Sequence, residues 1–257
     1  MKKLEELKQY TFVVRQLVAR EIKRKYSRSY LGILWSVLNP LLNMVVLSFI
    51  FTKMFSRSIE NYPLYLLTGQ TIWQLFTGAT NAAMTVMVDN QVMLTRVKFP
   101  MVIFPVARVY SALVNYLYTF VAYLLMLLVF RIRPNVTMLA APFIILCVTL
   151  FSLGMGYLLA VAYVFFADIK YLYTVLLSLW MYCSAIFYPV EQLPEMIGRI
   201  IEANPVYNYI ACMRSAMLYA AWPTQAQWIR MLVWAVIMYA VGSLIFHRSQ
   251  NRIMQTV

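Results

Sequence analysis

The chain has 257 residues, of which 63% are hydrophobic and only 12% are charged, and its formal net charge is +13. Soluble domains carry about 25% charged residues, so this composition excludes a soluble globular protein. Apolar runs of about 20 residues recur along the chain, and each is long enough to cross a hydrocarbon core about 30 Å thick. We therefore expect an all-α polytopic membrane protein, whose cations flank the spans beside anionic lipid and do not bind nucleic acid.

The first segment, residues 1–30, is predicted to contain an amphipathic helix over 2–28. Its apolar positions share one face at 3.6-residue spacing, and its cations gather on another. The apolar positions are Leu4, Leu7, Tyr10, Val14, Leu17, Val18 and Ile22, and the cations are Lys8, Arg15, Arg20 and Lys23. Such a helix suits the membrane interface. A solvated basic helix that packs on a partner has the same pattern. No apolar core of a secretory signal is present in this segment.

Six transmembrane helices are predicted, at 31–52, 63–88, 104–130, 137–166, 171–189 and 226–247. An even number of spans places both termini on one side of the membrane. If that side is cytoplasmic, the inside segments hold 15 of the 22 Lys and Arg residues and the outside segments hold seven. The positive-inside rule then predicts a multi-pass protein of the cytoplasmic (inner) cell membrane with both termini in the cytoplasm.

The region 190–225 contains apolar pieces too short to span, broken by Pro194, Pro205 and Pro223. This pattern predicts extracytoplasmic re-entrant helices that dip into the outer leaflet, because irregular backbone at membrane depth needs protein or a wet cavity beside it. No internal repeat or linker marks a second domain. Residues 1–257 are therefore one transmembrane domain, with spans one to five in 31–189 and the sixth span and a cytoplasmic tail in 226–257.

The chain offers little for catalysis. It has one histidine, His247, and three cysteines with apolar neighbours, Cys147, Cys183 and Cys212. Paired carboxylates, metal-ligand spacing and a Walker A loop are absent from the sequence, so we predict no catalytic residue, no metal site and no cofactor bound by this chain. A membrane-embedded glycosyl- or acyltransferase is disfavoured for the same reason. The sequence indicates a transporter and not an enzyme.

Polar residues, most of them uncharged, recur at helical spacing inside several spans, as Arg108, Ser111 and Asn115 do in the third and Tyr171, Thr174, Ser178 and Tyr182 do in the fifth. Such stripes either line a wet passage for a hydroxyl-rich solute or bond helix to helix. A high aromatic content, 16%, suits contacts with sugar rings. The candidates for a translocation path are Ser36, Asn39, Asn43, Gln70, Trp73, Gln74, Thr77, Asn81 and Asn115.

The stretch REIKRKYSRSYLGILWSVLNPLL, from Arg20 to Leu42, resembles the opening of the ABC-2-type permeases that export polysaccharides, including O-antigen, capsule and teichoic acid. The matching features are the basic helix, Tyr26, Ser29-Tyr30-Leu31-Gly32, Trp35 and Asn39-Pro40. Further matches in order are Phe99-Pro100, Pro105, Asp168-Ile169, Phe187-Tyr188-Pro189, Leu193-Pro194-Glu195 and Asn204-Pro205. Ala167 departs from the family pattern, which commonly has Arg before this Asp.

The resemblance implies a homodimer that works with a separate nucleotide-binding ATPase subunit, which binds ATP and Mg. It also implies that the charged segment between the second and third spans is a coupling helix docked on that ATPase. Asp89 is then an N-cap, Met93 and Leu94 fill a groove, and Arg96 and Lys98 meet its rim; Asn90 and Gln91 complete the segment. A short solvated turn is the alternative.

A lipid-linked polysaccharide is the substrate that the resemblance implies. Its pyrophosphate would meet cations at a cytoplasmic gate formed by Arg24, Lys25 and Arg28, with Leu31 and Gly32 in the turn into the first span. These cations could also serve only the positive-inside rule. Two other functions remain open: an ABC-2 exporter of a small lipid or drug, and a passive channel for polar solutes.

Overall fold

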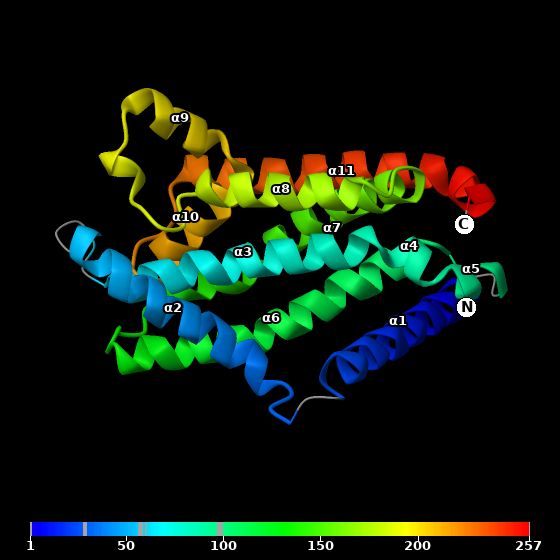
Figure 1. Ribbon diagram of the computed structural model, residues 1–257, viewed down its shortest axis with the longest axis horizontal. Helices are drawn as coiled ribbons and strands as arrows, with labels where there is room; N and C mark the ends of the chain where they lie inside the picture. The colour runs from blue at the N-terminus through cyan, green and yellow to red at the C-terminus, as the bar shows by residue number, and fades with distance from the viewer. Residues whose placement is uncertain (1, 28–29, 56–58, 60, 97–99, 257) are drawn as a thin grey trace.

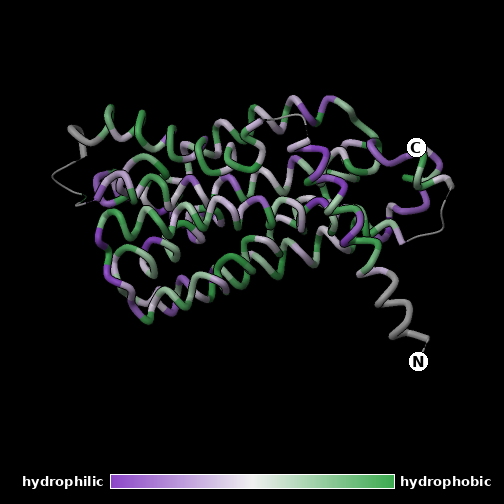
Figure 2. The backbone as a smooth tube through the Cα atoms, turned by 90° about the horizontal axis from the view of Figure 1, so that it is seen from below, coloured by the Kyte–Doolittle hydropathy of each residue, from purple (hydrophilic) through white to green (hydrophobic). Residues whose placement is uncertain are grey.

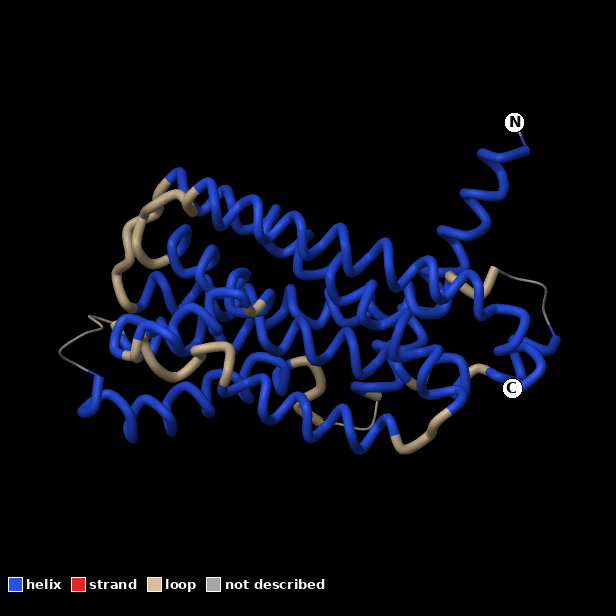
Figure 3. The backbone as a smooth tube through the Cα atoms, turned by 90° about the horizontal axis from the view of Figure 1, so that it is seen from above, coloured by secondary structure: helices blue, strands red, loops and turns tan. Residues whose placement is uncertain are grey.

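A computed structural model describes residues 2–27, 30–55, 59, 61–96 and 100–256. In that part of the chain every regular element is an α- or 3-10 helix, and loops join the helices mainly at the two ends of an elongated bundle (Figure 3). Four helical segments are long and apolar enough to cross a membrane: Leu34–Phe51, Ile103–Val129, Val136–Phe165 and Gln225–Thr256. Figure 2 shows hydrophobic residues along the long helices, interrupted by hydrophilic ones. The all-α class is confirmed.

Helices occupy all six predicted spans, with two differences at their ends. Those that follow the prediction closely are α2 (Leu34–Phe55), α3 (Tyr62–Met84), α6 (Ile103–Val129) and α7 (Ala141–Phe165), the last preceded by η1 (Val136–Ala140). α8 (Ile169–Tyr182) ends before residue 189, because Ala185 has a positive φ of 46° that no helix continues through. α11 (Gln225–Thr256) runs past residue 247, where neither Gly nor Pro interrupts it.

α3 lies at the centre of the bundle and packs against α2, α6, α7, α8 and α10 (Pro205–Met217) (Figure 1). Its glutamines, threonines and asparagine make it less apolar than the four segments named above. Neighbouring helices cover much of its surface, and Leu66, Ile72 and Phe76 are fully buried there. A helix that faces protein instead of lipid can carry polar side chains at little cost.

α7 and α11 pack most extensively of all helix pairs, because glycines let their backbones approach closely. A Cβ on Gly242 would overlap the backbone of Gly154, and a Cβ on Gly154 would overlap the backbone of Met238. Small residues at such crossings are typical of membrane helices, whose association depends on van der Waals contact.

α1 (Lys2–Tyr26) packs against α6 at the end of the bundle where α11 ends (Figure 1). Leu17 and Val18 are buried in a cluster with Met87, Phe104 and Phe246. The apolar face from Tyr10 to Ile22 therefore packs on the chain's own core, and the place of this helix in the membrane interface stays a prediction. The start of α1 and the end of α11 share one end of the bundle, as the even number of predicted spans requires.

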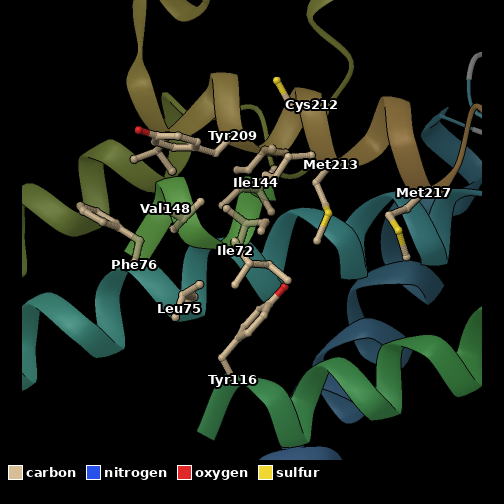
Figure 4. Close-up of a cluster of buried hydrophobic side chains, with 14 of the residues drawn as sticks. Ile72, Leu75, Phe76, Tyr116, Ile144, Val148, Tyr209, Cys212, Met213 and Met217 are labelled. Atoms are coloured by element: carbon tan, nitrogen blue, oxygen red, sulfur yellow. The ribbon is translucent and has the colours of Figure 1, made fainter. Parts of the chain in front are cut away.

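The predicted hairpin region forms η2 (Val190–Gln192), α9 (Glu195–Ala203) and α10 at the opposite end of the bundle. α10 begins where the Asn204 side chain accepts a hydrogen bond from the Val206 amide at 2.9 Å. Its residues Tyr209, Cys212 and Met213 are buried over α3 and α7 (Figure 4). α9 leaves Met196 and Ile200 exposed. The region thus divides into a buried helix and an exposed amphipathic one.

Candidate functional site

The segment between α3 and α6 forms two short helices, α4 (Val86–Asp89) and α5 (Gln91–Arg96). Asp89 is the last residue of α4, so the prediction that it caps the following helix is wrong. Its carboxylate instead accepts hydrogen bonds from Arg108 at 2.8 Å and from the Thr85 hydroxyl at 2.8 Å. Asn90 lies between the two helices and accepts a hydrogen bond from Arg20 at 3.0 Å.

The side chains of α5 point differently from the coupling-helix prediction. Leu94 is 6% exposed and belongs to the chain's own core, and Met93 is only half-buried against it. Leu94 is therefore unavailable to fill a partner's groove. The outward face carries Gln91, Val92 and Thr95, of which Val92 is 59% exposed. Arg28 and Lys98, and the side chain of Arg96, lie outside the described part of the chain.

A cavity of about 780 Å³ lies between α1, α2, α3 and α6. It reaches the surface, because Asn39, Gly78 and Asp89 in its wall are exposed. The lining residues are Glu21, Arg24, Lys25, Tyr26, Trp35, Ser36, Asn39, Pro40, Gln74, Leu75, Gly78, Ala82, Asp89, Arg108, Ser111, Ala112, Asn115, Tyr116 and Thr119. Cations, carboxylates, amides and aromatic rings thus meet in one wall.

The cavity brings together part of each predicted set. Arg24 and Lys25 come from the gate, and Ser36, Asn39, Gln74 and Asn115 come from the path. The other predicted path residues, Asn43, Gln70, Trp73, Thr77 and Asn81, are not among the lining residues. Glu21, Trp35 and Thr119 also line the cavity but are not among the predicted path residues. The same holds for Arg108 and Ser111, although their spacing places them on one face of α6 with Asn115.

Leu31 and Gly32 form a turn at the entrance of α2, as predicted. Gly32 has a φ of 46°, a conformation that glycine adopts without strain. The Leu34 amide donates to the Leu31 carbonyl at 2.9 Å, which closes the turn. Neither residue lines the cavity.

Hydrogen bonds tie α6 to α1 and to α2, two of the helices around the cavity. The Tyr26 hydroxyl donates to Asn115 Oδ1 at 2.5 Å, and the Thr119 hydroxyl donates to the Ser36 carbonyl at 2.8 Å. Ser111, one turn before Asn115, has a buried hydroxyl with no hydrogen-bond partner in the described structure. Tyr116, also in the cavity wall, has a hydroxyl that is likewise unpaired in the described part of the chain, so the wall contains both bonded and unpaired polar atoms.

Charged side chains form a network at the end of the cavity nearest α4. Arg108 donates to Glu21 at 2.7 Å and to Asp89 at 2.8 Å, and so joins α1, α4 and α6. Arg24 and Lys25 add positive charge on the α1 side. Partial burial lowers the pKa of the Lys25 ammonium from its usual value.

Most of the hydrogen bonds made by the side chains of the polar stripes go to backbone carbonyls of the same helix. Thr77 donates to the Trp73 carbonyl at 2.9 Å, and Asn81 donates to the Thr77 carbonyl at 2.9 Å. Asn43 donates to Asn39 in the same way. In the described part of the chain, the hydrogen bonds of these three side chains stay within their own helices. Gln70 is half-buried, with an unpaired carbonyl oxygen in the described structure.

Residues 13–218 match the protein family described as ABC-2 type transporter. The match covers well over half of the chain. The chain belongs to this family. As a member it is a transporter permease and not itself an enzyme.

Full-length relatives share modest identity with this permease. It is 26% identical to the O-antigen export system permease protein RfbA of Myxococcus xanthus over 98% of both chains. It is 27% identical to a protein of the same description from Klebsiella pneumoniae, over 91% of this chain and 90% of that one. Identity to the polysialic acid transport protein KpsM of Escherichia coli is 25%, over 80% and 81% of the two chains.

Proposed function

We propose that this permease is the membrane subunit of an ATP-driven exporter that moves a lipid-linked polysaccharide, such as an O-antigen, a capsular glycan or a teichoic acid, across the cytoplasmic membrane. The relatives that it matches over 80% or more of their length are named for O-antigen export and for polysialic acid transport. The observation that carries the proposal is the cavity between α1, α2, α3 and α6.

The chemistry of the cavity suits a pyrophosphate joined to a sugar. Arg24 and Lys25 supply the charge-assisted donors that a phosphate needs. Ser36, Asn39 and Gln74 supply uncharged polar groups for hydroxyls, and the Trp35 ring offers an apolar plane on which a sugar ring can stack. A glycan can slide over such a surface because none of these groups demands a single partner.

Six crossings, by α2, α3, α6, α7, α8 and α11, place both termini in the cytoplasm in this proposal, with α9 and α10 in the outer leaflet. Asn39 and Asn43 are exposed on α2, beside the apolar Leu42 and Val46. Amides are poorly solvated by lipid tails, so this face favours contact with water or protein. A second copy of the chain would cover it, and the passage would then run between the two copies.

The energy would come from a separate ATPase subunit that holds ATP and Mg and docks at α4 and α5. These helices lie at the same end as the two termini, and Gln91, Val92 and Thr95 project from them. If the segment were only a solvated turn, the side chain of Val92 would stay exposed to water with nothing to cover it.

The proposal is tested by the ATPase activity of the permease reconstituted with its ATPase subunit in lipid nanodiscs. The probe is the lipid-linked glycan extracted from a strain in which export is blocked. We expect the glycan to stimulate ATP hydrolysis by the wild type. In the double variant Arg24→Ala with Lys25→Ala, we expect the glycan concentration for half-maximal stimulation to rise by about tenfold or more. The reason is that each charge-assisted hydrogen bond contributes roughly 1.5–3 kcal/mol to binding.

Lys23→Ala is the matched control, since Lys23 is an exposed cation of the same helix that does not line the cavity. Equal stimulation of the double variant and the wild type would contradict the proposal. Stimulation by a small lipid without glycan would favour the lipid or drug exporter, and solute flux without ATP would favour the channel.

A further inference from the structure

Arg108 lies where the cavity meets the segment formed by α4 and α5. Its guanidinium bonds at once to Glu21 of α1 and Asp89 of α4, and all three side chains line the cavity. Asp89 immediately precedes Asn90, which Arg20 also holds from α1. A single arginine on α6 thus links the cavity wall to the segment that presents Val92.

The two carboxylates do not hold Arg108 equally. The side chains of Arg108 and Glu21 are each 16% exposed, whereas that of Asp89 is 41% exposed. Solvent therefore screens the Asp89 contact more strongly than the Glu21 contact, which weakens it. Asp89 is therefore the partner that an incoming anion displaces more easily.

An anion in the cavity would find other groups beside Arg108. Ser111, one turn along α6, lines the cavity, and its buried hydroxyl has no hydrogen-bond partner in the described structure. Arg24 and Lys25 line the same cavity. Two phosphates carry more negative charge than one carboxylate, and arginine binds phosphate with bidentate geometry.

We propose that Arg108 exchanges Asp89 for a phosphate oxygen when a diphosphate headgroup enters the cavity, and that this exchange releases α4 and α5 from α6. The proposal rests on the proposed function, because it assigns a regulatory step to the same cavity. Glu21 stays on Arg108 and keeps the guanidinium in place. Loading of the substrate thereby changes the position of the segment on which the ATPase docks.

Thermodynamic linkage couples diphosphate binding to the release of α4 from Arg108, so each must favour the other. If a diphosphate loosens α4 and α5, then anything that pulls α4 away from Arg108 strengthens diphosphate binding by the same factor. Removal of the Asp89 charge alone should have this effect. If Asp89 served only to hold the structure together, its replacement would disorder the cavity and weaken diphosphate binding.

The experiment measures binding of undecaprenyl pyrophosphate and, in a second arm, of inorganic pyrophosphate to the complex of permease and ATPase in nanodiscs. Hydrogen exchange of the amides of residues 86–96 is followed in the same samples. For the wild type we expect undecaprenyl pyrophosphate to raise exchange in this segment. Asp89→Asn should show raised exchange without ligand and bind about three- to fivefold more tightly, whereas Arg108→Gln should bind several-fold more weakly.

Glu195→Gln is the control, because it removes the carboxylate of an exposed ion pair, with Arg199 at 2.6 Å, at the other end of the bundle. It should leave both binding and exchange unchanged. Binding of inorganic pyrophosphate with the same pattern would show that the phosphates suffice, and binding of the lipid form alone would show that the polyprenyl chain is also needed.

Unaltered or weaker binding by Asp89→Asn overturns the exchange mechanism, even if the wild type responds to the glycan as proposed above. Ligand binding to the wild type with no change in exchange at 86–96 also overturns it. Failure of the wild type to bind either diphosphate contradicts the exchange and the proposed substrate together.

Discussion

At the scale of single residues, Arg214 is the most unusual charge in the described structure. It is only 4% exposed, yet its hydrogen bonds go to backbone carbonyls and not to a carboxylate: Ala185 at 3.0 Å and Ile186 at 3.0 Å. Its guanidinium also lies over the Tyr65 ring, 3.4 Å from the ring centroid. A buried arginine is tolerated when its donors are satisfied and a ring faces it. Arg214 thus fastens α10 to α3 and to the loop after α8.

Replacement of Arg214 by methionine should therefore destabilise the permease. The carbonyls of Ala185 and Ile186 would lose their donor, and each buried unpaired group costs about 1–3 kcal/mol. We expect a lower unfolding temperature in detergent, measured by intrinsic fluorescence. Arg199→Met removes an exposed arginine at the same end of the bundle and should change stability by less than about 0.5 kcal/mol. Equal unfolding temperatures for the two variants would rule out this role of Arg214.

At the scale of elements, α5 shows how a short helix can serve two surfaces. Leu94 faces inward, where it packs in the cluster that holds Leu17 and Val18 of α1. Val92 faces outward, and an exposed valine at this end of the bundle is available to a docking partner. Movement of the partner would reach α1 through this shared packing as well as through Arg108.

The docking surface can be tested by the substitution Val92→Asp in the permease co-expressed with a tagged ATPase subunit. A buried, unpaired carboxylate in the contact should reduce co-purification at least tenfold. Val136→Asp is the control, since Val136 is 65% exposed at the opposite end of the bundle. Full recovery of the ATPase with the Val92 variant would move the docking site away from α5.

At the scale of the whole molecule, the arrangement of the helices distinguishes two ends of the bundle. The start of α1, the end of α11 and the helices α4 and α5 share one end of the bundle (Figure 1), whereas α9, α10 and η1, which packs on α10, lie at the other. The cationic N-terminal segment then favours the cytoplasm for the first end. Six crossings follow only if α3 and α8 also span. α8, with 14 residues, is about 21 Å long at 1.5 Å per residue, so the irregular residues after it would complete its crossing.

Cysteine accessibility in intact cells checks this topology. Asn135→Cys, before η1, should react with a membrane-impermeant maleimide, and Gln255→Cys, near the end of α11, should react only after the cells are opened. The background carries Cys183→Ser, because Cys183 is exposed whereas Cys147 and Cys212 are buried. Labelling of both positions in intact cells would contradict the three crossings, by α7, α8 and α11, that the proposed topology places between them.

The sequence by itself determined the class of the protein, the places of the helices, the turn at Leu31 and Gly32, and the family. These depend on local properties: the lengths of apolar runs, the residues that break helices and short motifs. The turn was predictable because glycine takes a positive φ without strain.

Only the tertiary structure decided which faces meet. The sequence placed Leu94 and Val92 on one short helix but not the rotation that buries the first and exposes the second. It marked Arg108 by its spacing, but Glu21, its partner at 2.7 Å, lies 87 residues away along the chain. Spacing along a helix reveals that a polar face exists, whereas its partners depend on how the helices pack. The cavity, lined by residues of α1, α2, α3, α4 and α6, is therefore a property of the fold.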